Sequence, residues 1–183
     1  MPRYVALLRG INVGGNNLIK MTALKACFEA QGFDDVATFI ASGNVLFTAS
    51  AAGAAKLARL IETALSSTFK YEANVVLRSQ KEMRDIVSDA PAGFGKQPDK
   101  YRYDVIFLKA PLTAAAAIKD VPVNPEVDTA RAGSGVLYFS RLIAKASKSR
   151  LGKIVSRPIY KNLTIRNWNT TSKLSQMLNG GDA

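Results

Sequence analysis

A glycine- and asparagine-rich stretch near the start of the chain is the first place where residue types and spacing could do chemistry. It runs from Gly10 to Asn17 and precedes a predicted helix. Glycines leave backbone N–H groups accessible, and a helix N-terminus favours negative charge, so such a loop can hold an anion. The expected ligand- or anion-binding residues are Arg9, Asn12, Gly14, Gly15, Asn16, Ser42 and Asn44.

The spacing of this loop is a weak phosphate signature. Its glycines are placed as in a P-loop, but Asn16 and Asn17 stand where the lysine and the Ser/Thr belong. The G-x-G-x-x-G spacing of dinucleotide-binding proteins is also absent. The alternative is a purely structural connection that needs positive φ angles, which glycine and asparagine tolerate.

A second candidate surface is the basic C-terminal stretch. The 183-residue chain has a net charge of +11, of which residues 1–130 contribute +2 and residues 131–183 contribute +9. Cations mixed with aromatic rings are typical of surfaces that hold phosphates and stack bases. The expected polyanion-binding residues are Lys148, Arg150, Lys153, Arg166 and Trp168. The alternatives are an ordinary solvated lysine face and a Trp168 that anchors the last helix.

The chain contains no histidine. Ser-His-Asp and Cys-His nucleophile pairs, imidazole acid–base chemistry and histidine-ligated metals are therefore excluded. The sequence identifies no catalytic residue, no metal site and no cofactor, and it leaves open whether the protein is an enzyme.

The elements that must position these residues follow from periodicity. Residues 4–8 form a predicted strand, 22–31 a helix, 36–41 and 44–48 a hairpin around Ser42-Gly43, 52–68 a helix and 74–78 a strand. This order is the ferredoxin-like βαββαβ arrangement. Chain direction then brings the loop Arg9–Asn17 and the turn Ser42–Asn44 to the same end of the sheet.

The second half repeats this order. A connecting helix over 80–88 and a loop over 91–98 precede a strand at 103–108, a helix at 113–119 and a hairpin of 126–131 with 136–140. A helix at 151–156, a strand at 163–166 and a final helix at 170–178 complete it. We therefore expect an α+β fold of two tandem ferredoxin-like subdomains, residues 1–79 and residues 80–183, the latter including the connecting and C-terminal helices.

Cysteine usage and hydropathy bear on the compartment. Cys27 is the only cysteine, and its helical spacing with Leu24 and Phe28 predicts a core position. A lone thiol cannot form an internal disulfide, and no apolar run of about 18 residues is present. We expect a cytoplasmic protein that does not span a membrane; its oligomeric state cannot be predicted.

Three separated segments resemble signature segments of the bacterial domain of unknown function 1697 family. They are Tyr4–Gly15, Ile40–Val45 and Thr164–Thr170. The resemblance covers nearly the whole chain and implies two ferredoxin-like α+β subdomains, but no activity, substrate or cofactor. Asn16-Asn17 stand where similar sequences lead us to expect a lysine, which weakens a phosphate clamp there.

Three functions remain as hypotheses. The leading one is binding of nucleic acid or another polyanion by the basic second half. The second is an enzyme or sensor for a small phosphorylated metabolite at the Arg9–Asn17 loop, with Arg9 as the charge clamp and Asn12 and Asn44 as orienting amides. The third is a protein-interaction module.

Overall fold

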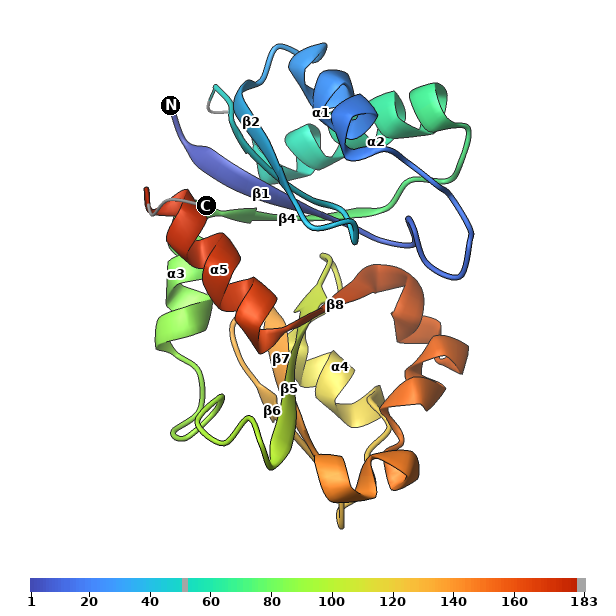
Figure 1. Ribbon diagram of the computed structural model, residues 1–183, viewed down its shortest axis with the longest axis vertical. Coiled ribbons are helices and arrows are strands. Elements are labelled where there is room, and N and C mark those ends of the chain that lie inside the picture. Colours follow the sequence, from blue (N-terminus) through green and yellow to red (C-terminus); the bar gives the residue numbers. More distant parts are fainter. Residues whose placement is uncertain (51–52, 181–183) are drawn as a thin grey trace. The chain divides into compact units, whose positions relative to one another are not determined.

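The computed structural model describes residues 1–50 and 53–180 (Figure 1). Its contacts divide the chain into two compact units. Unit 1 consists of Met1–Met83 with the chain end from Leu174, and unit 2 consists of Arg84–Lys173. The two boundaries fall inside the helices α3 (Gln80–Ser88) and α5 (Trp168–Leu178).

Unit 1 contains a four-stranded antiparallel sheet in the order β2-β3-β1-β4. Two helices cover one face of this sheet (Figure 1). The elements in chain order are β1 (Arg3–Leu8), α1 (Met21–Glu29), β2 (Asp34–Phe39), β3 (Asn44–Thr48), α2 (Ala54–Phe69) and β4 (Val75–Ser79).

The core of unit 1 forms because alternate strand residues meet the apolar stripes of α1 and α2. Phe47 on β3 packs against Phe28 of α1 at 5.5 Å and against Phe33 at 4.6 Å between ring centroids. Cys27 is buried beside them, which confirms its predicted core position. Full burial of each phenylalanine contributes roughly 1.5–3 kcal/mol to folding.

Unit 2 has the same strand order, β6-β7-β5-β8, and all neighbouring strands are antiparallel. One helix, α4, and three consecutive 3₁₀ helices occupy one side of its sheet (Figure 1). The elements are β5 (Tyr101–Leu108), α4 (Ala114–Asp120), β6 (Asp128–Ala132), β7 (Val136–Leu142), η1 (Ile143–Lys148), η2 (Leu151–Ser156), η3 (Pro158–Asn162) and β8 (Leu163–Asn167).

The stretch expected as a helix at 151–156 is a 3₁₀ helix between two others. Gly152, the β-branched pair Ile154-Val155 and Pro158 each disfavour a longer α-helix. Leu151 and Ile154, three residues apart, share a face of this 3₁₀ turn and enter the core of unit 2. The sequence therefore predicted a helix at this place but not its 3₁₀ type.

The protein is thus an α+β chain with two tandem ferredoxin-like subdomains, as its element order predicted. Within residues 1–50 and 53–180, no helix has both the length and the apolar character needed to cross a membrane.

Gly43 offers a test of how tightly the first hairpin turn packs. Its φ is +84°, and an added Cβ would lie 2.7 Å from Ile11 Cδ1 and 2.9 Å from Leu8 Cβ. We expect Gly43→Ala to lower the free energy of unfolding by about 2–4 kcal/mol, from backbone strain plus overpacking. Urea unfolding measures this change.

Gly32 is the matched control for Gly43. Its φ is +79°, but nothing lies within 4 Å of an added Cβ. Gly32→Ala should therefore lower the free energy of unfolding only through backbone strain, by about 1–2 kcal/mol. Equal losses in the two variants would show that the close packing on Gly43 contributes nothing.

Candidate functional site

The glycine–asparagine loop and the first hairpin turn lie together at one end of the unit 1 sheet, as topology predicted. The Asn12 side chain donates from Nδ2 to the Ala41 carbonyl oxygen at 2.9 Å. The Leu8 amide donates to the Gly43 carbonyl oxygen at 2.8 Å. The loop thus follows β1 directly and is tied to the turn between β2 and β3.

The asparagine side chains expected to orient a ligand are engaged by the protein itself. Asn12 Nδ2 also donates to the Ile19 carbonyl oxygen at 3.0 Å, and Asn12 Oδ1 accepts from the Ile19 amide at 2.8 Å. Asn44 is buried, and its Nδ2 donates to the Phe39 carbonyl oxygen and to Ser42 Oγ. These amides therefore shape the loop and the turn.

The middle of the loop is more open. Gly14, Gly15 and Asn16 are exposed, and both glycines have positive φ. The Asn16 amide donates to the Val13 carbonyl oxygen at 3.0 Å, which closes a small turn. Arg9 at the base of the loop is half-buried. An anion held here would rely on backbone amides of the glycines and on Arg9, not on Asn12 or Asn44.

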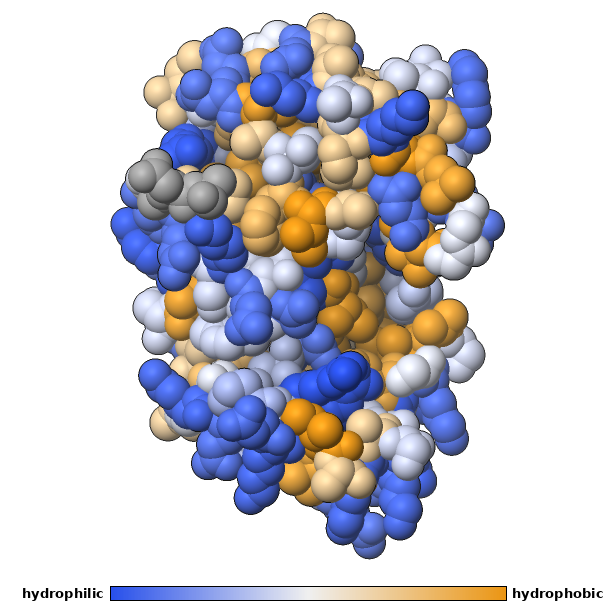
Figure 2. Space-filling model, in the orientation of Figure 1, coloured by the Kyte–Doolittle hydropathy of each residue, from blue (hydrophilic) through white to orange (hydrophobic). Residues whose placement is uncertain are grey.

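Unit 2 carries most of the excess positive charge. It contains 16 Lys and Arg residues against 7 Asp and Glu residues, a net charge of +9. We call the stretch from η1 to η3 the basic segment. It presents six exposed cations: Lys145, Lys148, Arg150, Lys153, Arg157 and Lys161. Figure 2 shows hydrophilic side chains alternating with apolar ones over the visible face of this unit. Lys148, Arg150 and Lys153, expected from the sequence, are all accessible to a partner.

Polar contacts from the hairpin side of unit 2 hold the basic segment in place. Asp128 is buried, and its Oδ2 accepts from the amides of Asn124 and Arg150, each at 2.9 Å. Asn124 Nδ2 donates to the Lys148 carbonyl oxygen at 3.0 Å. The backbone of Lys148 and Arg150 is therefore fixed while their side chains point to solvent.

Arg166 lies apart from this exposed set. It is buried on β8, and its Nη1 donates to Thr164 Oγ1 at 2.8 Å and to the Ile165 carbonyl oxygen at 2.9 Å. Burial lowers the pKa of its guanidinium to about 10, which still leaves it charged at neutral pH. Its contacts are those of a structural residue.

Trp168 anchors a loop rather than standing free. Its ring lies edge-on to Phe94, with 5.1 Å between ring centroids. An added Cβ on Gly95 would collide with the Trp168 indole, so the backbone of the loop lies directly against that ring. Trp168 thereby fixes the connection between α3 and β5, and it also lines the cleft described next.

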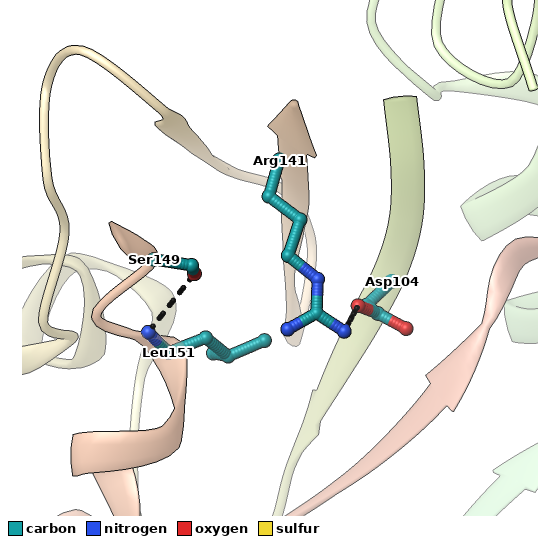
Figure 3. A network of polar contacts seen from close by, with 4 residues as sticks. All are labelled: Asp104, Arg141, Ser149 and Leu151. Carbon is teal, nitrogen blue, oxygen red and sulfur yellow. Dashed lines mark hydrogen bonds and ion pairs between the residues drawn. The ribbon is translucent and has the colours of Figure 1, made fainter. Parts of the chain in front are cut away.

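A cleft of about 440 Å³ opens beside the first half of β5. Its charged groups are Arg102, Asp104 and Arg141. Figure 3 shows the Arg141 guanidinium pointing toward Asp104, with Leu151 of the basic segment nearby. Asp104 Oδ2 lies 3.9 Å from Arg141 Nη2, too far for a hydrogen bond. Burial raises the pKa of the Asp104 carboxyl although both arginines oppose that change.

An adjoining pocket of about 250 Å³ lies between the loop after α3 and the strands β5, β6 and β7. Phe94, Tyr101, Tyr103 and Tyr138 form its aromatic walls. Tyr101 and Tyr103 line both this pocket and the cleft. We call this pocket the aromatic pocket and the neighbouring cleft the arginine cleft.

Tyr101, Tyr103 and Phe94 are not among the residues expected from the sequence. The expected strand began at Tyr103, which left Tyr101 outside it and hid their period-2 spacing. Two tyrosines at i and i+2 of one strand share a face of the sheet, and this was the available signal. Phe94 gave no signal, because a loop position alone does not reveal which surface the ring meets.

Over residues 1–50 and 53–180, no group of three or more Cys, Asp or Glu side chains is placed to hold a metal ion.

The fold and these surfaces define a tandem ferredoxin-like α+β protein, and sequence comparison assigns it to a family. The family described as "Protein of unknown function (DUF1697)" matches residues 1–138, so the chain belongs to this family, as its signature segments indicated. The structure is similar to that of the conserved bacterial protein SP0830 from Streptococcus pneumoniae. That similarity has a TM-score of 0.84 and 27% sequence identity, and it covers 97% of this chain and 98% of the other. No curated protein matches the sequence.

The raised pKa of Asp104 predicts a pH-dependent effect on stability. Because the folded carboxyl is the weaker acid, its ionisation opposes folding at pH 7, and the cost disappears once the unfolded carboxyl is also protonated, below about pH 4. We expect Asp104→Asn to raise the free energy of unfolding at pH 7 by on the order of 1 kcal/mol or less, and to change nothing at pH 3.

Urea unfolding at the two pH values measures this difference, with the exposed Asp99→Asn as the control for losing one negative charge. A variant that is clearly less stable than the parent at pH 7 would show instead that the ion pair with Arg141 outweighs the cost of burying Asp104.

Proposed function

We propose that this protein binds nucleic acid through the exposed basic segment of unit 2. The observation that carries the proposal is the arrangement of that segment: Leu151 and Ile154 point into the core while six cations face solvent. Exposed positive charges on a fixed backbone suit a polyanion, and phosphate contacts supply much of the affinity in such complexes.

The charges of the basic segment are poorly neutralised within the chain. Arg157 pairs with Asp120 at 3.6 Å. Lys145, Lys148 and Lys153 form no ion pair with any residue that the structure describes. Like charges at this density repel one another, and a bound polyanion would relieve that repulsion while releasing its own counterions.

Aromatic rings elsewhere in unit 2, beside Lys100 and the arginines of the cleft, favour nucleic acid over other polyanions. Tyr101 lies at the junction of the arginine cleft and the aromatic pocket. Lys100 Nζ lies 5.4 Å from the centre of the Tyr101 ring. A surface that combines cations with accessible ring faces is typical of proteins that bind single-stranded nucleic acid.

We place this activity in the cytoplasm. Cys27, the one cysteine, is buried and free, which fits a reducing compartment. Nucleic acid is also available there. Fractionation of cells that make the protein at its native level tests this placement, and recovery outside the cytoplasm would contradict it.

Neutralising the basic segment should weaken binding and flatten its salt dependence. We expect the triple variant Lys145→Gln, Lys148→Gln, Lys153→Gln to bind a single-stranded oligonucleotide about tenfold more weakly at low salt. The slope of log K against log[salt] should fall by about 2, since each lost phosphate contact removes roughly 0.7. Fluorescence anisotropy at several salt concentrations measures both quantities.

The matched control removes three exposed lysines from unit 1: Lys20→Gln, Lys25→Gln, Lys56→Gln. It has the same net charge as the first variant but an intact basic segment. Equal losses in the two triple variants would show that only net charge matters. Failure of the parent protein to bind single-stranded or duplex RNA or DNA at low salt would overturn the proposal.

A further inference from the structure

The aromatic pocket has rigid walls. Phe94 lines the pocket and meets Tyr103 and Tyr138 edge to face, with ring centroids 4.9 and 5.4 Å away. Trp168 holds Phe94 from a third direction. Tyr103 Oη accepts from the Gln97 amide, and Tyr138 Oη donates to the Ile86 carbonyl oxygen at 2.6 Å. These bonds fix the rings, so the pocket exists before any ligand arrives.

The volume of the pocket suits one small planar ring system. At about 250 Å³ it exceeds the roughly 150 Å³ of an engineered cavity that accepts benzene. It is smaller than the roughly 300–1,000 Å³ of pockets that enclose drug-sized ligands. A single aromatic heterocycle fits this size, whereas a complete dinucleotide would not.

The polar groups of the pocket suit a ring with hydrogen-bonding edges. The hydroxyls of Tyr103 and Tyr138 are already engaged, and burial raises the pKa of Tyr138 to about 12, which keeps its phenol neutral. Thr129, Arg131 and Ser140 also line the pocket. Their side chains form no hydrogen bond or ion pair with the part of the chain that the structure describes, so they remain available to a ligand.

We infer that the aromatic pocket takes one unstacked nucleobase of a single-stranded nucleic acid. The inference rests on the proposed function and specifies its substrate class. Tyr101 is shared between the pocket and the arginine cleft, so a base in the pocket places its flanking phosphates beside Arg102 and Arg141. A duplex keeps its bases stacked and paired, and it therefore presents no base to such a pocket.

An abasic strand separates base recognition from phosphate binding. We compare three fluorescein-labelled 12-nucleotide probes by anisotropy with the full-length protein: a mixed-sequence single strand, the same sugar-phosphate chain without bases, and the duplex. The base-bearing single strand should bind about tenfold more tightly than the abasic strand, because one base stacks in the pocket. It should also bind more tightly than the duplex.

A pocket-filling variant locates the effect. Thr129 is exposed on the edge strand β6, so Thr129→Trp should fold and occupy the pocket. It should reduce binding of the base-bearing strand to the abasic level and leave abasic binding unchanged. Tyr101→Ala should also weaken binding of the base-bearing strand, because it removes a wall of the pocket. Thr63→Trp, at an exposed position of α2, is the matched control and should change neither.

The outcomes distinguish this inference from the proposed function. Equal, salt-dependent binding of the base-bearing and abasic strands would overturn the base pocket and leave the polyanion surface standing. Duplex binding as tight as single-strand binding, or a Thr129→Trp variant that retains the preference for bases, would also overturn the pocket. Absence of binding to every probe would overturn both.

Discussion

Asp128 is the buried carboxylate on which the position of the basic segment depends. From Arg131 to Leu178 the sequence has no acidic residue, so the exposed cations of η1–η3 repel one another, and Arg157 finds its counter-charge on Asp120 of α4. Asp128 opposes that repulsion from β6 by accepting the Arg150 amide, while Leu151 and Ile154 bury their side chains below. The hydrogen bond to Asp128 and the burial of Leu151 and Ile154 therefore fix the backbone of the basic segment on unit 2. Its cationic side chains stay exposed to a partner.

The two units share a strand order but satisfy their loops in different ways. In unit 1 the side chains of Asn12, Asn17 and Asn44 donate to main-chain carbonyl oxygens, so these amides stabilise the loop and the turn instead of facing a ligand. In unit 2 the loop after α3 is fixed by packing of its own Phe94 and Gly95 against Trp168. That packing leaves polar and cationic side chains at the edges of a preformed pocket. The same topology thus gives unit 1 a loop and turn whose asparagine amides bond to its own backbone. It gives unit 2 an exposed surface with charged and aromatic side chains.

Much of the fold could be predicted from the sequence, whereas the residues of the candidate site in unit 2 could be predicted only in part. The i, i+3, i+4 spacing of Leu24, Cys27 and Phe28 and the Ser42-Gly43 turn predicted unit 1 because local pattern and tertiary packing agree there. The 151–156 stretch became a 3₁₀ helix because Gly152 and the β-branched pair weaken an α-helix that burial of two residues cannot restore. Exposure of Lys148 and Lys153 could be expected from composition. Burial of Arg166 and the meeting of Phe94 with Tyr103 could not, because they depend on which face a strand turns inward and on where a loop folds back.

The most direct measurement is a titration of the ¹⁵N-labelled full-length protein with a single-stranded oligonucleotide, followed by amide chemical shifts. Binding through unit 2 predicts that shifts concentrate on Lys148, Lys153, Tyr101 and Arg131, and that Gly14 and Gly15 remain unchanged. Shifts centred on Gly14, Gly15 and Asn16 would place an anion site on the glycine–asparagine loop instead and contradict binding through the basic segment. A spectrum unchanged at saturating oligonucleotide and low salt would contradict nucleic-acid binding altogether.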